Sequence, residues 1–239
     1  MGLADILTRK YPANYDAHAR SVAVDGYWQQ VRRTVGGKPV AESQILLIVN
    51  AIIDGLSLTE TDVVLDLACG NGALSSYLFD KCGGLVGVDI SPYLIEIAEK
   101  GFARPPHYRF CVDDIVSYLT RERDTAVFTK VLIYASFQYF SRQDAATTLK
   151  VLNEKFSEIS KVFIGNIPDK RHSDKFFGEQ MPPESELNDH EARIGVWYLP
   201  EEIETLAQST GWRASCSSMP TEFYLSDHRF DVTLERAGS

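Results

Sequence analysis

A glycine-containing turn, Asp66-Leu67-Ala68-Cys69-Gly70-Asn71-Gly72, joins the short apolar run of residues 63–65 to a helical pattern that begins at residue 73. Glycine adopts positive φ and lets a backbone approach a ligand closely. The first turn of the following helix presents free N–H groups to such a ligand. Strand, turn and helix in this order indicate the first unit of an open α/β sheet, with Asp66 at the edge where such sheets bind ligands.

Strand and helix patterns alternate along the rest of the chain. We expect strands at residues 63–65, 84–89, 107–112, 126–131, 161–167, 213–219 and 229–235, and helices at residues 41–54, 73–79, 92–100, 142–156 and 200–209. This alternation predicts a mostly parallel sheet with helices on both faces. The last two strands have no helix between them, so we expect the last one to run antiparallel. The predicted fold is α/β, a Rossmann-like seven-stranded sheet.

Two further segments flank this core. Residues 1–40 are polar with interspersed aromatic residues and end at a Gly36-Gly37 break, which predicts a short helical cover before a main domain at residues 41–239. Residues 168–196 contain three prolines, several charges and no clear period. Because this long segment follows the fifth strand, we expect a lid-like insertion over a functional site.

The charge balance limits the partners. Lys and Arg number 24 against 33 Asp and Glu, a net charge of −9, and no basic cluster is longer than Arg32-Arg33. We therefore expect no nucleic-acid partner, although a small basic pocket remains compatible with one phosphorylated molecule. No apolar run reaches the roughly 18 residues of a membrane span and no signal-peptide pattern is present, so the expected location is the cytoplasm. The four cysteines lack zinc-site spacing, and we expect no metal.

Acidic residues close the second and third expected strands. A carboxylate at Asp89, the end of the second strand, is placed to accept hydrogen bonds from both hydroxyls of an adenosine ribose. Asp113 and Asp114 follow the third strand, where a carboxylate can accept from an adenine amino group while Ile115 covers the ring.

Together these residues resemble the class I S-adenosylmethionine-dependent methyltransferase family, over about residues 41–211. The family's glycine motif is an acidic residue followed by three alternate glycines. Asp66, Gly70 and Gly72 match it, while Ala68 replaces the first glycine with a residue still small enough for the turn.

The resemblance implies S-adenosylmethionine as cofactor. Asp66 and the loop amides would face its methionine part, Asp89 its ribose, and Asp114 in preference to Asp113 its adenine. In similar small-molecule enzymes a tyrosine before the core covers the cofactor and a basic residue meets its carboxylate. The residues assigned to the cofactor are Tyr15, Arg20, Asp66, Ala68, Gly70, Gly72, Asp89, Ile90, Asp113, Asp114, Ile115 and Lys130.

The methyl acceptor is expected at the carboxyl ends of the fourth and fifth strands and at the connection before the last strand. The polar residues there predict a small, polar substrate, hydroxylated or phosphorylated. The Asp/Asn-Pro-Pro-Tyr/Phe signature of adenine and glutamine methylation is absent from the chain. The residues assigned to the substrate are Tyr134, Gln138, Asn166 and Tyr224.

A hydroxyl acceptor benefits from a base, and we assign this role to His172 or His228, with His190 as a further loop histidine. The predicted reaction is methyl transfer to a hydroxyl of a sugar or similar molecule. The chain's ending, residues 219–232, looks like that of small methyltransferases associated with bacterial surface carbohydrate.

Three alternatives remain. An N-methyltransferase needs only a deprotonated amine. A nicotinamide enzyme would need Gly or Ala where Ser75 stands. A non-catalytic binding protein would have no chemical need for the cofactor carboxylates.

Overall fold

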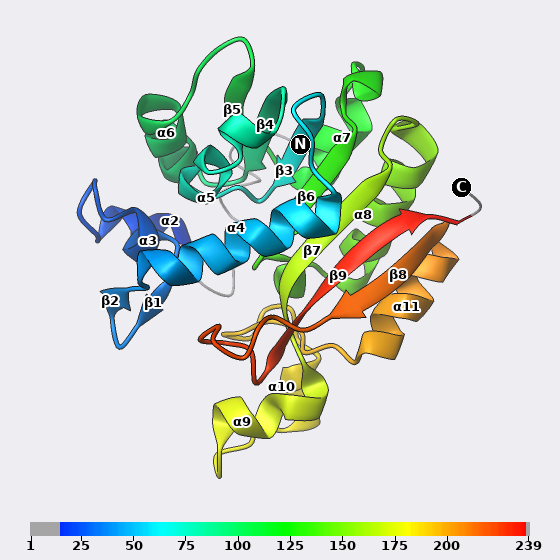
Figure 1. The fold of residues 1–239 in the computed structure, drawn as a ribbon. Helices are drawn as coiled ribbons and strands as arrows, with labels where there is room; N and C mark the ends of the chain where they lie inside the picture. Colours follow the sequence, from blue (N-terminus) through cyan, green and yellow to red (C-terminus); the bar gives the residue numbers. More distant parts are fainter. Residues whose placement is uncertain (1–14, 238–239) are drawn as a thin grey trace.

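The apolar run before the glycine turn is an inner strand of a seven-stranded sheet in the computed structural model, which describes residues 15–237 (Figure 1). The strands are β3 (Val63–Leu67), β4 (Gly84–Asp89), β5 (Tyr108–Val112), β6 (Lys130–Tyr134), β7 (Lys161–Pro168), β8 (Trp212–Ser217) and β9 (Arg229–Arg236). Their spatial order is β5-β4-β3-β6-β7-β9-β8. The first five are parallel, and β9 is antiparallel to both of its neighbours. The predicted Rossmann-like sheet is confirmed.

Helices cover both faces of this sheet and bury its apolar side chains in two clusters. One face carries α4 (Glu42–Leu56), α5 (Ala73–Ser76) and α6 (Pro92–Gly101), and the other carries α7 (Ile115–Arg121), α8 (Arg142–Lys155) and α11 (Pro200–Ser209). Figure 1 shows α4 lying across the strands on the first face. Every residue of β4 is buried, as expected for a strand covered on both faces. Within residues 15–237, no helix combines the length and the apolar character that a bilayer crossing requires.

The fourth parallel strand begins later than the sequence pattern predicts. The strand expected at residues 126–131 is β6, Lys130–Tyr134, and the preceding Thr125–Val127 forms a 3-10 turn. Val127 is 46% exposed, whereas all five residues of β6 are buried. Both segments are apolar, so composition alone does not distinguish the buried one. The shift moves Lys130 from the end of the strand to its beginning.

Two short structures flank the sheet. The N-terminal cover consists of α2 (Tyr15–Arg20), α3 (Tyr27–Gln30) and the hairpin β1 (Thr34–Val35) with β2 (Lys38–Pro39), and the rest of the predicted cover, residues 1–14, lies outside the described residues. The segment after β7 contains η4 (Lys170–His172), α9 (Ser173–Phe177) and α10 (Glu184–Leu187). It returns to the core at Tyr198, whose N–H donates to the carbonyl of Pro168 at 2.9 Å.

A bulge interrupts the pairing of β7 with β9. Ile164 pairs with Val232 and Ile167 pairs with Phe230, so β7 holds one residue more than β9 between these pairs. Asn166, within the bulge, has a φ of 63°. Its N–H donates to Oδ1 of Asp231 at 2.7 Å, and its carbonyl accepts from Nη1 of Arg229 at 3.1 Å. The bulge therefore directs the N–H and the carbonyl of one residue of β7, Asn166, at two charged side chains of β9.

The contact between α4 and β7 requires Gly55. A Cβ atom at this position would overlap the ring of Phe163, which is 2% exposed. We expect Gly55→Ala to lower the free energy of unfolding by about 1–3 kcal/mol, the usual range for overpacking. Chemical denaturation measures this change.

Gly101 in α6 provides the matched control. A Cβ atom there would have its nearest neighbour, Oη of Tyr27, at an ordinary 3.6 Å. Gly101→Ala should leave stability unchanged or raise it slightly, because alanine is the better helix former. Equal stabilities of the two variants would contradict the packing argument.

Candidate active site

A cavity of about 760 Å³ opens at the carboxyl ends of the parallel strands. Its walls include the ends of β3, β4 and β6 and the start of α7. Tyr15, Asp16 and Arg33 of the N-terminal cover line it, as do His190 and Glu191 of the segment after β7. The parallel strands, the cover and the predicted lid therefore share one cavity.

The glycine turn forms one wall of this cavity. Ala68, Gly70 and Asn71 line it, and Ala68 and Gly70 have φ values of 63° and 60°. Alanine is strained in this region, so the residue that replaces the family's first glycine carries a cost of about 1–2 kcal/mol. Gly72 lies outside the lining, and a Cβ there would crowd Phe110. Its role in this structure is packing.

Asp89 lies at the end of β4 and faces the turn. Its Oδ2 accepts the N–H of Gly70 at 2.8 Å and its Oδ1 accepts the N–H of Ser91 at 2.9 Å. Burial raises the pKa of Asp89, while these two backbone bonds favour the ionised form. The hydroxyl of Ser91 in turn donates to Asp16 of the cover at 2.7 Å. Ile90 also lines the cavity beside Asp89.

Asp66 is more deeply buried, 3% exposed, at the end of β3. The hydroxyl of Ser75 donates to its Oδ2 at 2.6 Å. Burial raises the pKa of Asp66 to about 7, against the opposing effect of this hydrogen bond, and the nearby charge of Asp89 raises it further. The free protein therefore holds this carboxyl partly protonated near neutral pH.

The acidic pair after β5 divides between two roles. Asp114 and Ile115 line the cavity, and Asp114 also caps α7 by accepting the N–H of Ser117 at 3.0 Å. Asp113 is outside the lining and forms an ion pair with Arg121 at 2.5 Å. This geometry is consistent with Asp114 as the adenine ligand and assigns Asp113 a structural contact.

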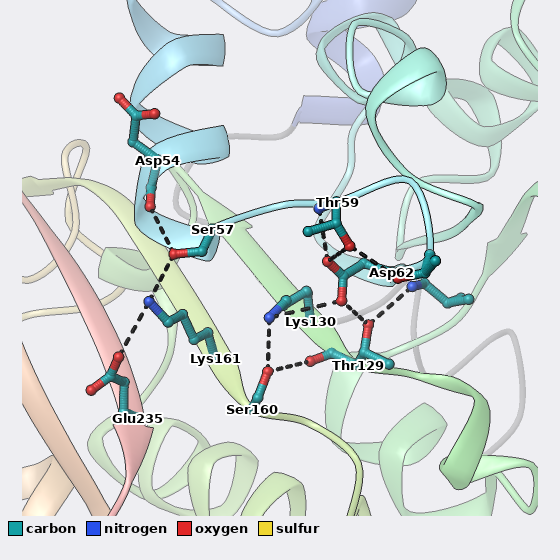
Figure 2. A network of polar contacts seen from close by, with 11 residues as sticks. Asp54, Ser57, Thr59, Asp62, Thr129, Lys130, Ser160, Lys161 and Glu235 are labelled. Carbon is teal, nitrogen blue, oxygen red and sulfur yellow. Dashed lines mark hydrogen bonds and ion pairs between the residues drawn. The ribbon is translucent and has the colours of Figure 1, made fainter.

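Two basic residues assigned to the cofactor lie elsewhere. Lys130 is at the amino end of β6, the opposite edge of the sheet, where its Nζ donates to Ser160 at 2.8 Å and approaches Asp62 at 3.8 Å (Figure 2). Arg20 is exposed and pairs with Asp16 at 2.7 Å. The cavity-lining cation of the cover is Arg33, whose guanidinium lies 5.1 Å from the ring centroid of Tyr134.

Of the four residues assigned to the substrate, Tyr134 lines the cavity, and its buried hydroxyl has no hydrogen-bond partner. Gln138, Asn166 and Tyr224 are outside the lining. Gln138 turns back to donate to the carbonyl of Ala135 at 3.1 Å, and Asn166 is held by the β7 bulge.

Both histidines assigned as base also lie outside the lining. The side chain of His172 is 48% exposed and contacts Asp169 at 3.2 Å. His228 is 7% exposed, its Nδ1 is 2.5 Å from Asp227, and its ring packs near Trp197. Burial lowers the pKa of His228. The structure therefore does not bring either ring together with the cavity-lining carboxylates, and the assignment of His172 or His228 as the base stays a prediction. The third loop histidine, His190, does line the cavity.

Several lining residues carried no signal in the sequence. Asn71 donates from Nδ2 to the carbonyl of Tyr27 and to Oε1 of Gln30, each at 2.8 Å, and so ties the turn to the cover. Ser136 and Thr148 present buried hydroxyls without partners. The sequence shows Asn71 between two glycines, but it does not show that this side chain contacts Tyr27 and Gln30 of the cover.

Comparison with known proteins agrees with this geometry. The family model described as "Methyltransferase domain" matches residues 64–155. An uncharacterized methyltransferase of Schizosaccharomyces pombe is 39% identical over 49 residues, 20% of this chain and 19% of that protein. A putative methyltransferase of Invertebrate iridescent virus 6 is 27% identical over 146 residues, 57% of this chain and 54% of that protein. The chain spans about half or less of the curated relatives it matches.

Solved structures share the fold. A DhpI–SAH complex has a TM-score of 0.65 at 13% identity, covering 98% of this chain and 99% of that one. Magnesium protoporphyrin IX methyltransferase from Synechocystis with bound SAM has a TM-score of 0.57 at 15% identity, covering 94% and 98%. The family match shows similarity to a methyltransferase domain over residues 64–155, and these neighbours show that the fold is shared.

Because the pKa of Asp66 is raised, replacing this residue should increase stability towards alkaline pH and decrease cofactor affinity. In the folded protein this pKa lies above its ordinary value of 3.8, so the stability it contributes is fully present below about pH 4 and is lost as the pH rises through about 7. We expect the stability of Asp66→Asn relative to the native protein to increase between pH 5 and pH 8, by more than about 1 kcal/mol. Its affinity for S-adenosylmethionine, a cation, should fall because the ionised carboxylate is lost.

Thermal unfolding at the two pH values and calorimetric titration measure these effects. Asp80→Asn, at an exposed aspartate, is the control and should change neither. A pH-independent stability difference would show that Asp66 does not titrate as described.

Proposed function

We propose that this protein is an S-adenosylmethionine-dependent methyltransferase that transfers a methyl group to an oxygen atom of a small polar molecule. The observation that carries the proposal is one continuous cavity. Asp66, Asp89 and Asp114 face it from three neighbouring strand ends, and it extends past β6 to Tyr134 and Ser136. The first part fits the cofactor, and the second leaves space for an acceptor.

The residues present fit the cofactor. Asp89 would accept from the ribose hydroxyls, with Asp114 and Ile115 beside the adenine. The backbone at Gly70 allows the methionine part to approach closely, and a Cβ there would crowd Val31 at 3.1 Å. Arg33, in place of Arg20, would meet the cofactor's carboxylate.

When bound, the cofactor would supply an electrophilic methyl group, whose bond to sulfur would break as its bond to the acceptor oxygen forms, leaving the electron pair on sulfur. The protein's part is alignment and exclusion of water. Tyr15 and Asp16 line the cavity from the cover, and His190 and Glu191 line it from the segment after β7. The cover and the segment after β7 thus border the cavity on two sides, which favours the exclusion of water that methyl transfer requires.

A hydroxyl acceptor must lose its proton during the transfer, and His190 is the cavity-lining histidine of residues 15–237. We assign it as the base. A sugar or sugar derivative is the proposed acceptor, and the link to surface carbohydrate rests on the chain's ending alone. N-methylation is the second candidate because an amine requires no base. A nicotinamide enzyme and a non-catalytic binding protein are not favoured by the methyltransferase matches.

Incubation with cofactor labelled on its methyl group and a fractionated extract tests the proposal. Label is expected in a small molecule, which mass spectrometry then identifies. Asp89→Ala is the matched inactive control, because loss of a charged hydrogen-bonded contact should weaken cofactor binding by about 1.5–3 kcal/mol. Label mainly in RNA or protein would overturn the small-molecule assignment, and unchanged cofactor affinity of Asp89→Ala would overturn the ribose assignment.

Replacement of His190 tests the base. His190→Asn should lower turnover of a hydroxyl acceptor by about 10²–10⁴-fold, the usual contribution of a general base, with cofactor affinity unchanged. His172→Asn, an exposed histidine outside the cavity, is the control and should keep full turnover. Full turnover of the hydroxyl acceptor in both variants would overturn the assignment of His190 as the base.

A further inference from the structure

Arg229, the first residue of β9, is a buried cation with few partners. It is 9% exposed, and its guanidinium lies 5.7 Å from the ring centroid of Trp197. Nη1 donates to the carbonyl of Asn166, whereas Nε is buried with no hydrogen-bond partner. Across residues 15–237, no carboxylate lies within ion-pairing distance of it.

The last residue of the same strand, Arg236, is an arginine whose guanidinium nitrogens each have a hydrogen-bond acceptor. Arg236 lies 5.3 Å from the ring centroid of Trp212, a similar arrangement. Its Nε, Nη1 and Nη2 donate to three backbone carbonyls at 2.9, 2.8 and 2.6 Å. A buried guanidinium that lacks such partners is unfavourable, so the geometry at Arg229 calls for an acceptor from outside the fold.

The nearest carboxylate on the strand does not supply that acceptor. Asp231 lies two residues along β9, and its Oδ1 accepts the N–H of Asn166 at 2.7 Å. Burial raises the pKa of Asp231 to about 6. Its charge is therefore neither paired with Arg229 nor fully developed at mildly acidic pH.

Arg229 is not itself a lining residue of the cavity, but it lies close to one: it donates to Asn166, whose neighbour Gly165 pairs with the lining residue Tyr134. Burial lowers the pKa of Arg229 to about 10, and Tyr139, Tyr224, Tyr134 and Tyr15 act in the opposite direction. Three of these tyrosines line the cavity, all but Tyr224. The hydroxyl of Tyr134 is a second buried donor without a partner. Two buried donors without partners, one of them charged, thus lie at the carboxyl end of β6 and at the start of β9.

We propose that the methyl acceptor carries an oxyanion, a carboxylate or a phosphate group, and that the guanidinium of Arg229 and the hydroxyl of Tyr134 bind it. This inference rests on the proposed function, since it assumes that the acceptor occupies this part of the cavity. Hydrogen bonds from charged donors to oxyanions are about twice as strong as neutral ones, and an arginine offers two parallel N–H groups. The cofactor's own carboxylate is assigned to Arg33, so Arg229 remains for the acceptor.

Anion binding in the presence of saturating SAH tests the proposal without turnover, because SAH fills the cofactor's carboxylate site. Inorganic phosphate and succinate are titrated separately by calorimetry. The native protein should bind at least one of them saturably, and the better probe identifies the class of oxyanion. Arg229→Met should weaken that binding at least about ten-fold, while SAH affinity stays within about two-fold.

Two further variants keep the outcome decisive. Arg213→Met removes one positive charge from neighbouring β8, where Arg213 pairs with Glu235 at 2.6 Å, and should leave anion binding unchanged. If Arg229→Met fails to fold, Tyr134→Phe decides, because it removes only an oxygen that lacks a partner, and it should weaken anion binding several-fold.

SAH binding with no saturable binding of either probe would overturn the inference, as would equal anion affinity in the native protein and in Arg229→Met or Tyr134→Phe. If the native protein does not bind SAH at all, the proposed function itself would be overturned instead.

Discussion

Two backbone N–H groups, those of Gly70 and Ser91, donate to the carboxylate of Asp89 at the end of β4. One belongs to the glycine turn after β3 and the other to the start of α6, so a single side chain fixes the geometry between two βα units. Ser91 extends the connection to Asp16 of the cover. A carboxylate offers about four acceptor positions, so two hydrogen bonds from the protein leave capacity for a ligand. The same group that organises the cavity wall is therefore able to bind a ligand within the cavity.

The ends of β3 and β4 place two carboxyl groups close together in a buried environment. Asp66 and Asp89 are both buried, and each has a pKa raised mainly by that burial. Such sites are unfavourable in the free protein and are compensated when a cation binds, which is a common relation between stability and function. The counterpart, behind β6, is the single cation Arg229 among several tyrosines. Opposite local charges of this kind are not visible in a net charge of −9.

The sequence predicted those parts of the site in which local pattern and topology coincide. Asp66, Asp89 and Asp114 each follow an apolar run, and the parallel arrangement of β3, β4 and β5 brings such positions to one edge. The assignment of Lys130 to the cofactor differs from the structure because two apolar segments are adjacent in the sequence. The later one is the buried strand β6, and the sequence pattern does not distinguish it from the earlier one. Arg20 and Arg33 are both basic residues of the cover, and the docking of α2 and α3, which depends on contacts such as those of Asn71, decides which one faces the cavity. Contacts between residues far apart in the sequence produce no local hydrophobic periodicity, so the sequence pattern does not predict them.

The bulge in β7 has an effect beyond re-aiming one residue. Arg229 and Asp231 lie on the same face of β9, and in a regular ladder they would be each other's most accessible partners. The bulge instead offers each side chain a backbone group of Asn166, its carbonyl to the arginine and its N–H to the aspartate. Two neutral backbone groups thereby take the place of an ion pair between these side chains. An irregularity of the backbone thus leaves the guanidinium of Arg229 able to attract an anion.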